Sequence, residues 1–171
     1  MQQLCFFEKT EKKFWQELKS GKFARMVIKE SKGQYLNGST EAFYVLKPLF
    51  ADVDDIERMY CIFMDRKNNI LSIEKVASGS LSSSAVYPRE LIKRTIKHKA
   101  ASVVISHNHP SGDPHPSNED RCLTIKLAFA FKAIDVNVLD HIIVGDSYYS
   151  FADNGIMEEI KQKFNQFLSI T

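Results

Sequence analysis

The sequence predicts an α/β fold. Runs rich in β-branched and aromatic residues at 58–64, 70–77 and 101–106 have the length and composition of strands. Apolar residues recur with the spacing of amphipathic helices around these runs, as the segment 118–133 shows. A chain of 171 residues with 44% apolar content can bury a substantial core, so one main domain is expected.

The first part of the chain is expected to be an extension, residues 1–38, ahead of a domain over residues 39–171. Residues 9–20 have the pattern of a short amphipathic helix that ends at Gly21 and carries Phe14, Trp15 and Leu18 on one side. Residues 23–29 could form a strand. The extension is therefore predicted to be partly helical and partly extended.

The first helix of the main domain is predicted over residues 39–50. Ser39 suits a helix start, and Pro48 is expected to kink or shorten the last turn. The strands 58–64 and 70–77 are predicted to form a hairpin with its turn at Asn68-Asn69. The small residues at 79–84 indicate a loop.

Two more helices are predicted on either side of the strand 101–106. Residues 88–99 form a helix with Pro88 in its first turn, and residues 118–133 form the next. The inward side of the first helix is predicted to carry Leu91, Ile92, Thr95 and Ile96. The inward side of the second is predicted to carry Leu123, Leu127, Ala130 and Phe131.

The last part of the chain is predicted to add short strands and a terminal helix. The β-rich runs lie at 136–139, 142–144 and 148–151, with a turn at Gly145-Asp146. Residues 155–169 have the apolar spacing of an amphipathic helix, which must cover either this core or a partner.

Charge and cysteine content exclude several classes of protein. Lys and Arg number 23 against 21 Asp and Glu, so the net charge gives no support for a nucleic-acid partner. Weak support comes only from the excess of basic residues in the first 32 positions. Cys5, Cys61 and Cys122 contain no C-x-x-C pair, which excludes a zinc ribbon. No signal-peptide pattern and no apolar run of membrane-spanning length occurs, so we expect a cytoplasmic protein without a membrane partner; the sequence specifies no oligomeric state.

Metal-binding residue types gather between the strand 101–106 and the helix 118–133. His107 and His109 are two residues apart at the strand end, so their side chains share a face. Asp120 lies in the first turn of the helix and reaches the same point if the loop folds back. Two imidazoles and one carboxylate are the ligand set of an open catalytic zinc site with water in the fourth position.

These residues also have a structural interpretation. Ser117-x-x-Asp120 is a capping box, in which the serine accepts from the N–H three residues on and the acidic side chain reaches back. The two histidines favour the metal site, because imidazole is a poor core residue unless its nitrogens are satisfied. One aspartate can serve as both cap and ligand, since the helix dipole keeps it ionised.

The complete spacing His-x-His, seven residues, Ser, two residues, Asp resembles the motif of the JAMM (MPN+-type) metalloprotease family. The surrounding segments HNHPSGDP at 107–114, DHIIVG at 140–145 and PRE at 88–90 look like the RadC branch of that family. The resemblance runs from about Ser39 to Phe151. It implies a mixed β-sheet flanked by helices, with the layering of cytidine deaminases, and thus a JAMM/RadC-like metal-binding domain over residues 39–171.

The resemblance also implies roles for individual residues. It implies Zn2+ held by His107, His109 and Asp120, a water-activating glutamate on an earlier strand, and Ser117 hydrogen-bonded to the developing oxyanion. Glu57, ahead of the strand 58–64, is the best candidate for that glutamate, because the general base must be a carboxylate near the metal but not bound to it. The alternative is that Glu57 is a solvated charge that ends an acidic segment.

The expected function is zinc-dependent hydrolysis of an amide or isopeptide bond, as in metallopeptidases, with an unidentified peptide or isopeptide as substrate. Glu57 would deprotonate the attacking water and pass the proton to the leaving amine. Two other classes stay open: a DNA-repair-associated accessory protein, and a non-catalytic interaction module that retains a metal. The helix-hairpin-helix module of larger RadC-like proteins has no counterpart here, which argues against DNA binding, and structural zinc sites usually have four protein ligands.

Other polar residues near the motif have competing interpretations. His141 beside Asp140 could form a second layer of hydrogen bonds around the metal ligands, although a structural hydrogen bond within the sheet is the simpler expectation. Tyr87 stands where the RadC pattern often has histidine, and its phenol can still donate a hydrogen bond. His115 lies in the loop and is expected to face solvent.

Overall fold

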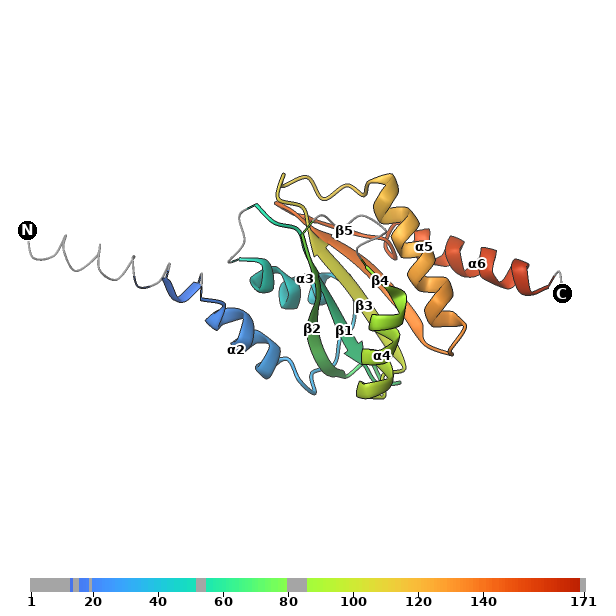
Figure 1. The fold of residues 1–171 in the computed structure, drawn as a ribbon, viewed down its shortest axis with the longest axis horizontal. Helices are drawn as coiled ribbons and strands as arrows, with labels where there is room; N and C mark the ends of the chain where they lie inside the picture. Colours follow the sequence, from blue (N-terminus) through green and yellow to red (C-terminus); the bar gives the residue numbers. More distant parts are fainter. Residues whose placement is uncertain (1–12, 14–15, 19, 52–54, 80–85, 170–171) are drawn as a thin grey trace, which may run out of the picture.

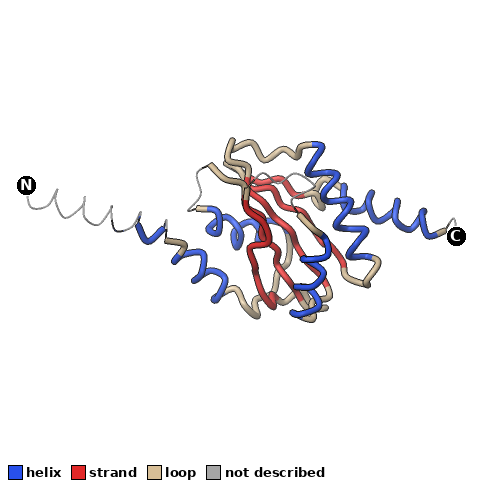
Figure 2. The backbone as a smooth tube through the Cα atoms, viewed as in Figure 1, coloured by secondary structure: helices blue, strands red, loops and turns tan. Residues whose placement is uncertain are grey.

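The computed structural model describes residues 13, 16–18, 20–51, 55–79 and 86–169 of the chain. These residues form a five-stranded sheet with helices on both of its faces (Figures 1 and 2). The strand order is β2-β1-β3-β4-β5. The predicted α/β class is therefore confirmed.

The sheet is mixed, as the family resemblance implied. β1 (Arg58–Met64) and β2 (Ile70–Ser78) form the predicted antiparallel hairpin. β3 (Ser102–Asn108) pairs antiparallel with β1 and parallel with β4 (Asn137–Val144). β5 (Tyr148–Ser150) then returns antiparallel along the last residues of β4, after the predicted turn. The C-terminal ends of β3 and β4 consequently lie side by side, which is where parallel α/β units place their sites.

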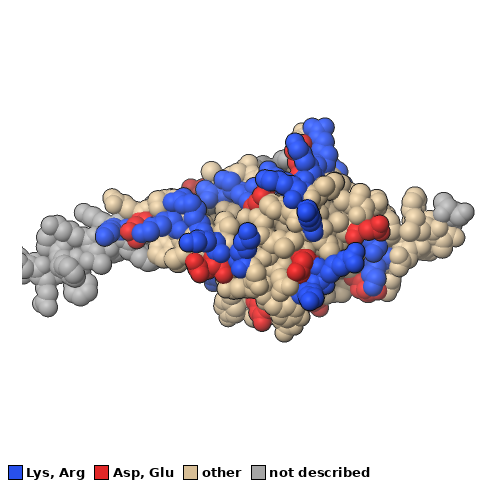
Figure 3. Space-filling view, turned by 90° about the horizontal axis from the view of Figure 1, so that it is seen from below, with Lys and Arg blue, Asp and Glu red and all other residues tan. Residues whose placement is uncertain are grey.

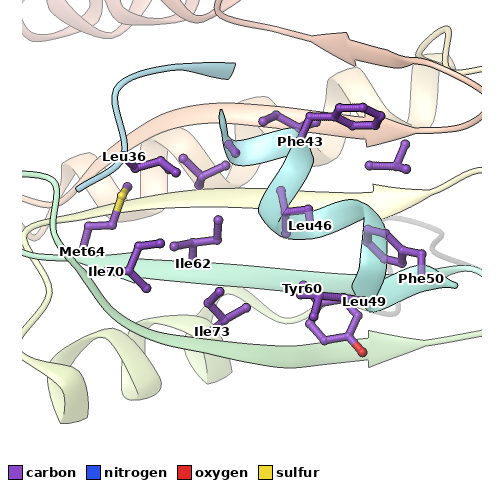
Figure 4. Close-up of a cluster of buried hydrophobic side chains, with 14 residues drawn as sticks. Leu36, Phe43, Leu46, Leu49, Phe50, Tyr60, Ile62, Met64, Ile70 and Ile73 are labelled. Atoms are coloured by element: carbon purple, nitrogen blue, oxygen red, sulfur yellow. The ribbon is translucent and has the colours of Figure 1, made fainter. Parts of the chain in front are cut away.

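Helices divide the core into two layers. On one face, α3 (Ser39–Leu46) continues into a short 3-10 helix, η1 (Lys47–Phe50), where Pro48 shortens the α-helix as predicted. Figure 4 shows Leu46, Leu49 and Phe50 in this layer, packed against the sheet. On the other face, α4 (Pro88–His98) and α5 (Asn118–Lys132) cover a second buried cluster.

The alternating directions of the side chains along β3 determine the face of the sheet to which His107 points. Val103 and Ile105 belong to the buried cluster under α4 and α5, whereas Val104 belongs to the cluster under α3. Successive side chains of a strand point to opposite faces, so His107 continues the series of Val103 and Ile105. Its imidazole therefore points to the face of the sheet that α5 covers.

The expectation of a strand at residues 23–29 is wrong. These residues lie in a helix, α2 (Lys22–Glu30), which starts after Gly21 in a left-handed conformation. Val27 and Ile28 follow Ala24 by three and four positions, and all three residues pack against the buried cluster that includes residues of α3. The helical spacing of these contacts outweighs the β-propensity of individual residues.

The expectation of two strands at 136–139 and 142–144 is also wrong, because β4 runs unbroken through Asp140 and His141. Both residues are buried, and hydrogen bonds satisfy their polar atoms, so the polar pair does not interrupt the strand.

One predicted inward residue of α4, Ile96, is 66% exposed. Leu91, Thr95, Leu123, Leu127 and Phe131 are buried as predicted.

The C-terminal helix, α6 (Ile156–Leu168), confirms the expected amphipathic helix and extends away from the sheet towards the C-terminus (Figure 1). Ile160 is buried, and Phe164 lies edge-on to Phe129 of α5 with ring centroids 5.1 Å apart. Its last turn is less covered, because Phe167 is 62% exposed. The helix therefore covers this core with Ile160 and Phe164.

Several predictions are not tested by the described residues. Most of the helix expected at 9–20 and of the loop expected at 79–84 lies outside the described residues. The boundary between an extension and a main domain at residue 38 stays a prediction. None of the described helices is both long and apolar enough to span a membrane, and the cytoplasmic location also stays a prediction.

The charged surface gives no single-sign field on the face that Figure 3 shows. Lys and Arg side chains spread across this face, with Asp and Glu side chains among them. Mixed charges of this kind partly cancel at a distance, whereas nucleic-acid sites present a basic patch or stripe. A nucleic-acid partner therefore gains no support from this face and stays a prediction.

Candidate metal centre

His107, His109 and Asp120 meet where β3 ends and α5 begins. The Nε2 atoms of the two histidines are 2.9 Å apart. Asp120 places Oδ1 3.1 Å from the His107 Nε2 and Oδ2 3.5 Å from the His109 Nε2. The side chains of His107 and Asp120 are 1% and 6% exposed, and that of His109 is 14% exposed, so the cluster opens to solvent mainly beside His109.

The loop between β3 and α5 reaches back because glycines bring two backbone segments into contact. Gly112 has a φ of 84°, which favours glycine, and its N–H donates to the His109 carbonyl. Its own carbonyl accepts from the Asp146 N–H at 2.8 Å. A Cβ on Gly145 would lie 2.1 Å from the Gly112 oxygen, so the β4–β5 turn can approach this closely only with glycine at 145.

Asp120 is both a helix cap and a member of the cluster, as the sequence allowed. Its N–H donates to the Ser117 Oγ at 3.1 Å, and its Oδ2 accepts from the Ser117 N–H and hydroxyl at 2.8 and 2.6 Å. Burial opposes ionisation, but the adjacent imidazoles of His107 and His109 outweigh it and hold the pKa of Asp120 well below its usual range. The same contact with Asp120 raises the pKa of His109.

The donor atoms fit a tetrahedral zinc ion. Zinc bonds of about 2.0–2.1 Å at tetrahedral angles separate neighbouring ligand atoms by roughly 3.3 Å. The two Nε2 atoms are 2.9 Å apart, and the distances from them to the nearer Asp120 oxygens, 3.1 Å to Oδ1 and 3.5 Å to Oδ2, are also close to that value. Two imidazole nitrogens and a carboxylate oxygen are also ligands that zinc accepts. The residues present can thus hold a metal ion.

A buried chain of hydrogen bonds stands behind His107. Its Nδ1 lies 2.8 Å from the Nε2 of His141, and the Nδ1 of His141 lies 2.6 Å from the Thr124 hydroxyl. That hydroxyl donates to the Asp120 carbonyl at 2.6 Å. Burial lowers the pKa of His141 well below its usual range, so the ring is neutral. Thr124 was missed in the sequence, although its position one helical turn after Asp120 was an available signal.

Asp140 has a different role from the one that its position beside His141 suggested. Its Oδ1 accepts from the backbone N–H groups of His141 and Ala152, and its Oδ2 accepts from the Ser150 hydroxyl. These are structural hydrogen bonds, which was the simpler expectation. The imidazole of His141 turns instead towards His107. The imidazole of His141 therefore contacts the cluster directly behind His107, whereas the Asp140 carboxylate does not contact the cluster.

Glu57 lies near the cluster, at the start of β1. Met59 pairs with His107 in an antiparallel register, and extending that register by two residues places Glu57 opposite His109. The Glu57 carboxylate is close enough to contribute to the raised pKa of His109. Asn108, which the sequence analysis missed, holds this segment: its Oδ1 accepts from the Arg58 N–H at 2.7 Å, and its Nδ2 donates to the Ile56 carbonyl at 3.2 Å.

The remaining candidates lie outside the cluster. The His115 side chain is 76% exposed, as expected, and pairs with Asp113 in the loop; Tyr87 is 54% exposed. A hollow of about 320 Å³ adjoins His109 and is lined also by Phe50 and Asp146. A larger hollow of about 430 Å³ lies between α5, β4 and α6 and is lined by none of the cluster residues. A ligand in the hollow beside His109 could reach the cluster.

Known proteins share this sequence pattern. A family model described as the RadC-like JAB domain matches residues 36–156. A UPF0758 protein of Coxiella burnetii (strain Dugway 5J108-111) is 46% identical over 98 residues, which cover 57% of this chain and 44% of that protein. A UPF0758 protein of Symbiobacterium thermophilum is 42% identical over 116 residues, or 67% of this chain and 49% of that protein.

A UPF0758 protein of Thiobacillus denitrificans is 44% identical over 102 residues, which cover 59% of this chain and 46% of that protein. The chain spans about half the length of the curated relatives it matches. The family model covers well over half of the chain, including Glu57 and the whole His-His-Asp cluster. The chain therefore belongs to the RadC-like JAB domain family, which is part of the JAMM/MPN family.

Proposed function

We propose that this protein is a zinc-dependent hydrolase that cleaves an amide or isopeptide bond. The observation that supports this most directly is the geometry of the cluster, in which the two imidazole Nε2 atoms are 2.9 Å apart and each lies 3.1 or 3.5 Å from a carboxylate oxygen of Asp120. Three protein ligands leave one position of a tetrahedral ion free for chemistry, whereas structural zinc sites usually use four. Because the matched segment covers only about half of each relative's length, the proposal concerns the reaction of this domain.

Zinc held by His107, His109 and Asp120 would supply a Lewis acid that polarises a carbonyl and lowers the pKa of water to about 7. Glu57 has the position that a general base needs, because it lies at the strand end opposite His109 without belonging to the ligand set. In the proposed reaction its carboxylate takes a proton from the attacking water and returns it to the leaving amine. The balance is one amide and one water consumed, one acid and one amine formed.

Ser117 is the proposed hydrogen-bond donor to the oxyanion. It is exposed at the edge of the cluster, and its hydroxyl now donates to the Asp120 Oδ2 at 2.6 Å. Rotation about one side-chain bond would exchange this partner for a substrate oxygen. The hollow beside His109 has room for a peptide segment, and its lining includes both apolar Phe50 and acidic Asp146. A peptide or isopeptide is therefore the proposed substrate class.

The test compares four forms of the protein for zinc content and for hydrolysis of a library of peptides and isopeptides. Glu57→Gln should keep zinc and lose at least about 100-fold in turnover, since general-base catalysis contributes about 10² to 10⁴. His107→Ala should lose both zinc and turnover. Glu158→Gln, an exposed substitution on α6, is the matched control and should behave as the wild type.

Each result separates the candidate functions. Zinc binding without turnover in the wild type would support a non-catalytic module that retains a metal. Salt-dependent retention of duplex DNA together with no hydrolysis would support the DNA-associated accessory protein. Turnover in Glu57→Gln equal to that of the wild type would remove Glu57 from the mechanism.

A further inference from the structure

We propose that Thr124 and His141 are positioning residues that fix the tautomer of His107 and so prepare its Nε2 to bind the metal. The proposal rests on the metal site described above, but not on the reaction that this site catalyses. Both residues are 0% exposed, and neither belongs to the ligand set. Their side chains connect the first ligand, His107, to the backbone of the last, Asp120.

The donor and acceptor of each hydrogen bond can be assigned in turn, starting at the metal ligand His107 and continuing through His141 to Thr124. His107 can offer a lone pair at Nε2 only if its proton is on Nδ1. That proton then points at the Nε2 of His141, 2.8 Å away, which must be a bare acceptor. The proton of neutral His141 is consequently on Nδ1, where it donates to the Thr124 oxygen at 2.6 Å.

The last step makes the chain unambiguous. A threonine hydroxyl has a single proton, and the Thr124 hydroxyl directs it to the Asp120 carbonyl at 2.6 Å. Its oxygen is therefore free to accept from His141. A backbone carbonyl cannot donate, so, with one proton on each imidazole, it fixes the direction of every hydrogen bond in the chain. The tautomers of both histidines follow from that one acceptor.

His109 is oriented by a simpler device, which serves as an internal comparison. Its Nδ1 lies 2.7 Å from the Asp113 carbonyl of the loop, which can only accept, so Nδ1 carries a proton and Nε2 is the nitrogen that a metal would bind. Both ligands thus present Nε2 to the same point, one through a direct backbone contact and one through two buried side chains. Water cannot replace Thr124 or His141 easily, because both lie in the closed interior between β3, β4 and α5.

The chain offers a matched pair of threonines for a test. Thr95 of α4 is 1% exposed, and its hydroxyl donates to the carbonyl four residues earlier, as that of Thr124 does. Among the described residues, the Thr95 hydroxyl bonds to the Leu91 carbonyl and to no imidazole. Thr124→Val and Thr95→Val therefore remove the same group from the same kind of environment, but only the first removes the acceptor of His141.

The experiment measures zinc affinity by competition with a chromophoric chelator. We expect Thr124→Val to weaken zinc binding about 10- to 100-fold, as is typical when a hydrogen-bond partner of a ligating histidine is lost. Thr124→Ser, which keeps the hydroxyl, should restore most of the affinity, and Thr95→Val should bind zinc as the wild type does. Equal zinc affinity in the two valine variants would overturn the proposal.

Nitrogen-15 spectra of the histidine rings in the wild type give a readout that does not require any variant to fold. His141 should be the Nδ1–H tautomer in both the metal-free and the zinc-loaded protein, and His107 should be Nδ1–H with zinc bound. An Nε2–H tautomer at His141 would also overturn the proposal. If His141 is the Nδ1–H tautomer and the zinc affinities are as expected, but no hydrolysis occurs, the proposed reaction is contradicted while the proposed role of Thr124 and His141 is supported.

Discussion

The Ser117 hydroxyl has two tasks that a substitution can separate from each other. It caps α5 by accepting from the Asp120 N–H, and it is the proposed donor to the oxyanion. Ser117→Ala should lower the free energy of unfolding by about 1 kcal/mol through the lost cap. It should also lower kcat about 10²- to 10³-fold through the lost donor. Urea unfolding and steady-state kinetics measure the two effects.

Ser117→Thr is the control for both effects, because threonine keeps the hydroxyl and is an acceptable capping residue. It should stay close to the wild type in stability and within a few-fold in kcat. A Ser117→Ala variant that loses stability but turns over normally would show that the serine is a cap alone. Zinc content should be measured in each variant, since the hydroxyl also contacts Asp120.

At the same scale, the convergence of His107, His109 and Asp120 was the feature that the sequence predicted best. Two histidines at a strand end and a capping aspartate have few other interpretations, so their convergence could be foreseen from local spacing. Asn108 and Thr124 could not be foreseen in the same way, because their partners are about 50 residues away or lie on another element. Such contacts depend on which strands become neighbours, and local periodicity does not determine that.

At the scale of elements, β3 carries one candidate ligand, His107, and also a support for the candidate base. His107 points to the α5 face, while the next residue, Asn108, holds the backbone on both sides of Glu57. Its side-chain oxygen accepts from the Arg58 N–H, and its amide donates to the Ile56 carbonyl. The ligand strand and the base therefore keep a fixed relation to each other.

Asn108→Ala should consequently reduce turnover more than metal binding. We expect kcat to fall at least about 10-fold, because small displacements of a catalytic group are costly. Zinc affinity should change less than threefold, since no ligand contact is lost. Asn108→Asp, which keeps an acceptor for the Arg58 N–H, should recover part of the lost kcat. Equal losses of zinc affinity and kcat in Asn108→Ala would contradict a specific effect on Glu57.

The elements that were predicted wrongly also share a cause. Residues 22–30 form a helix because Ala24, Val27 and Ile28 find a neighbouring core layer to pack against. β4 continues through Asp140 and His141 because partners for their polar groups come from Ser150, Ala152 and Thr124. In both cases tertiary contacts outweigh local sequence preference.

At the scale of the whole molecule, Asp140 should make stability depend on pH. Burial raises the pKa of its carboxyl from 3.8 to about 6 in the folded protein. A raised pKa in the folded state means that this contribution is fully present below about pH 4 and is lost as the pH rises through 6. The shift corresponds to about 3 kcal/mol, at about 1.4 kcal/mol for each pKa unit.

Asp140→Asn should remove this contribution, because an amide can accept from the same backbone N–H groups without ionising. We expect the wild type to lose more free energy of unfolding than Asp140→Asn when the pH is raised from 4.5 to 7.5. Urea unfolding of the metal-free proteins at both pH values measures the difference. Identical pH dependence in the two proteins would contradict a raised pKa at Asp140.

The contact between Gly112 and Gly145 bears on how an ion would enter this domain. Because two backbone segments already touch there, the loop that carries His109 has its shape before anything is bound. Capture of a cation would then resemble the filling of a rigid synthetic chelator, with little ordering of the polypeptide and little heat-capacity change. Zinc fingers, which acquire their structure only when loaded, represent the opposite extreme.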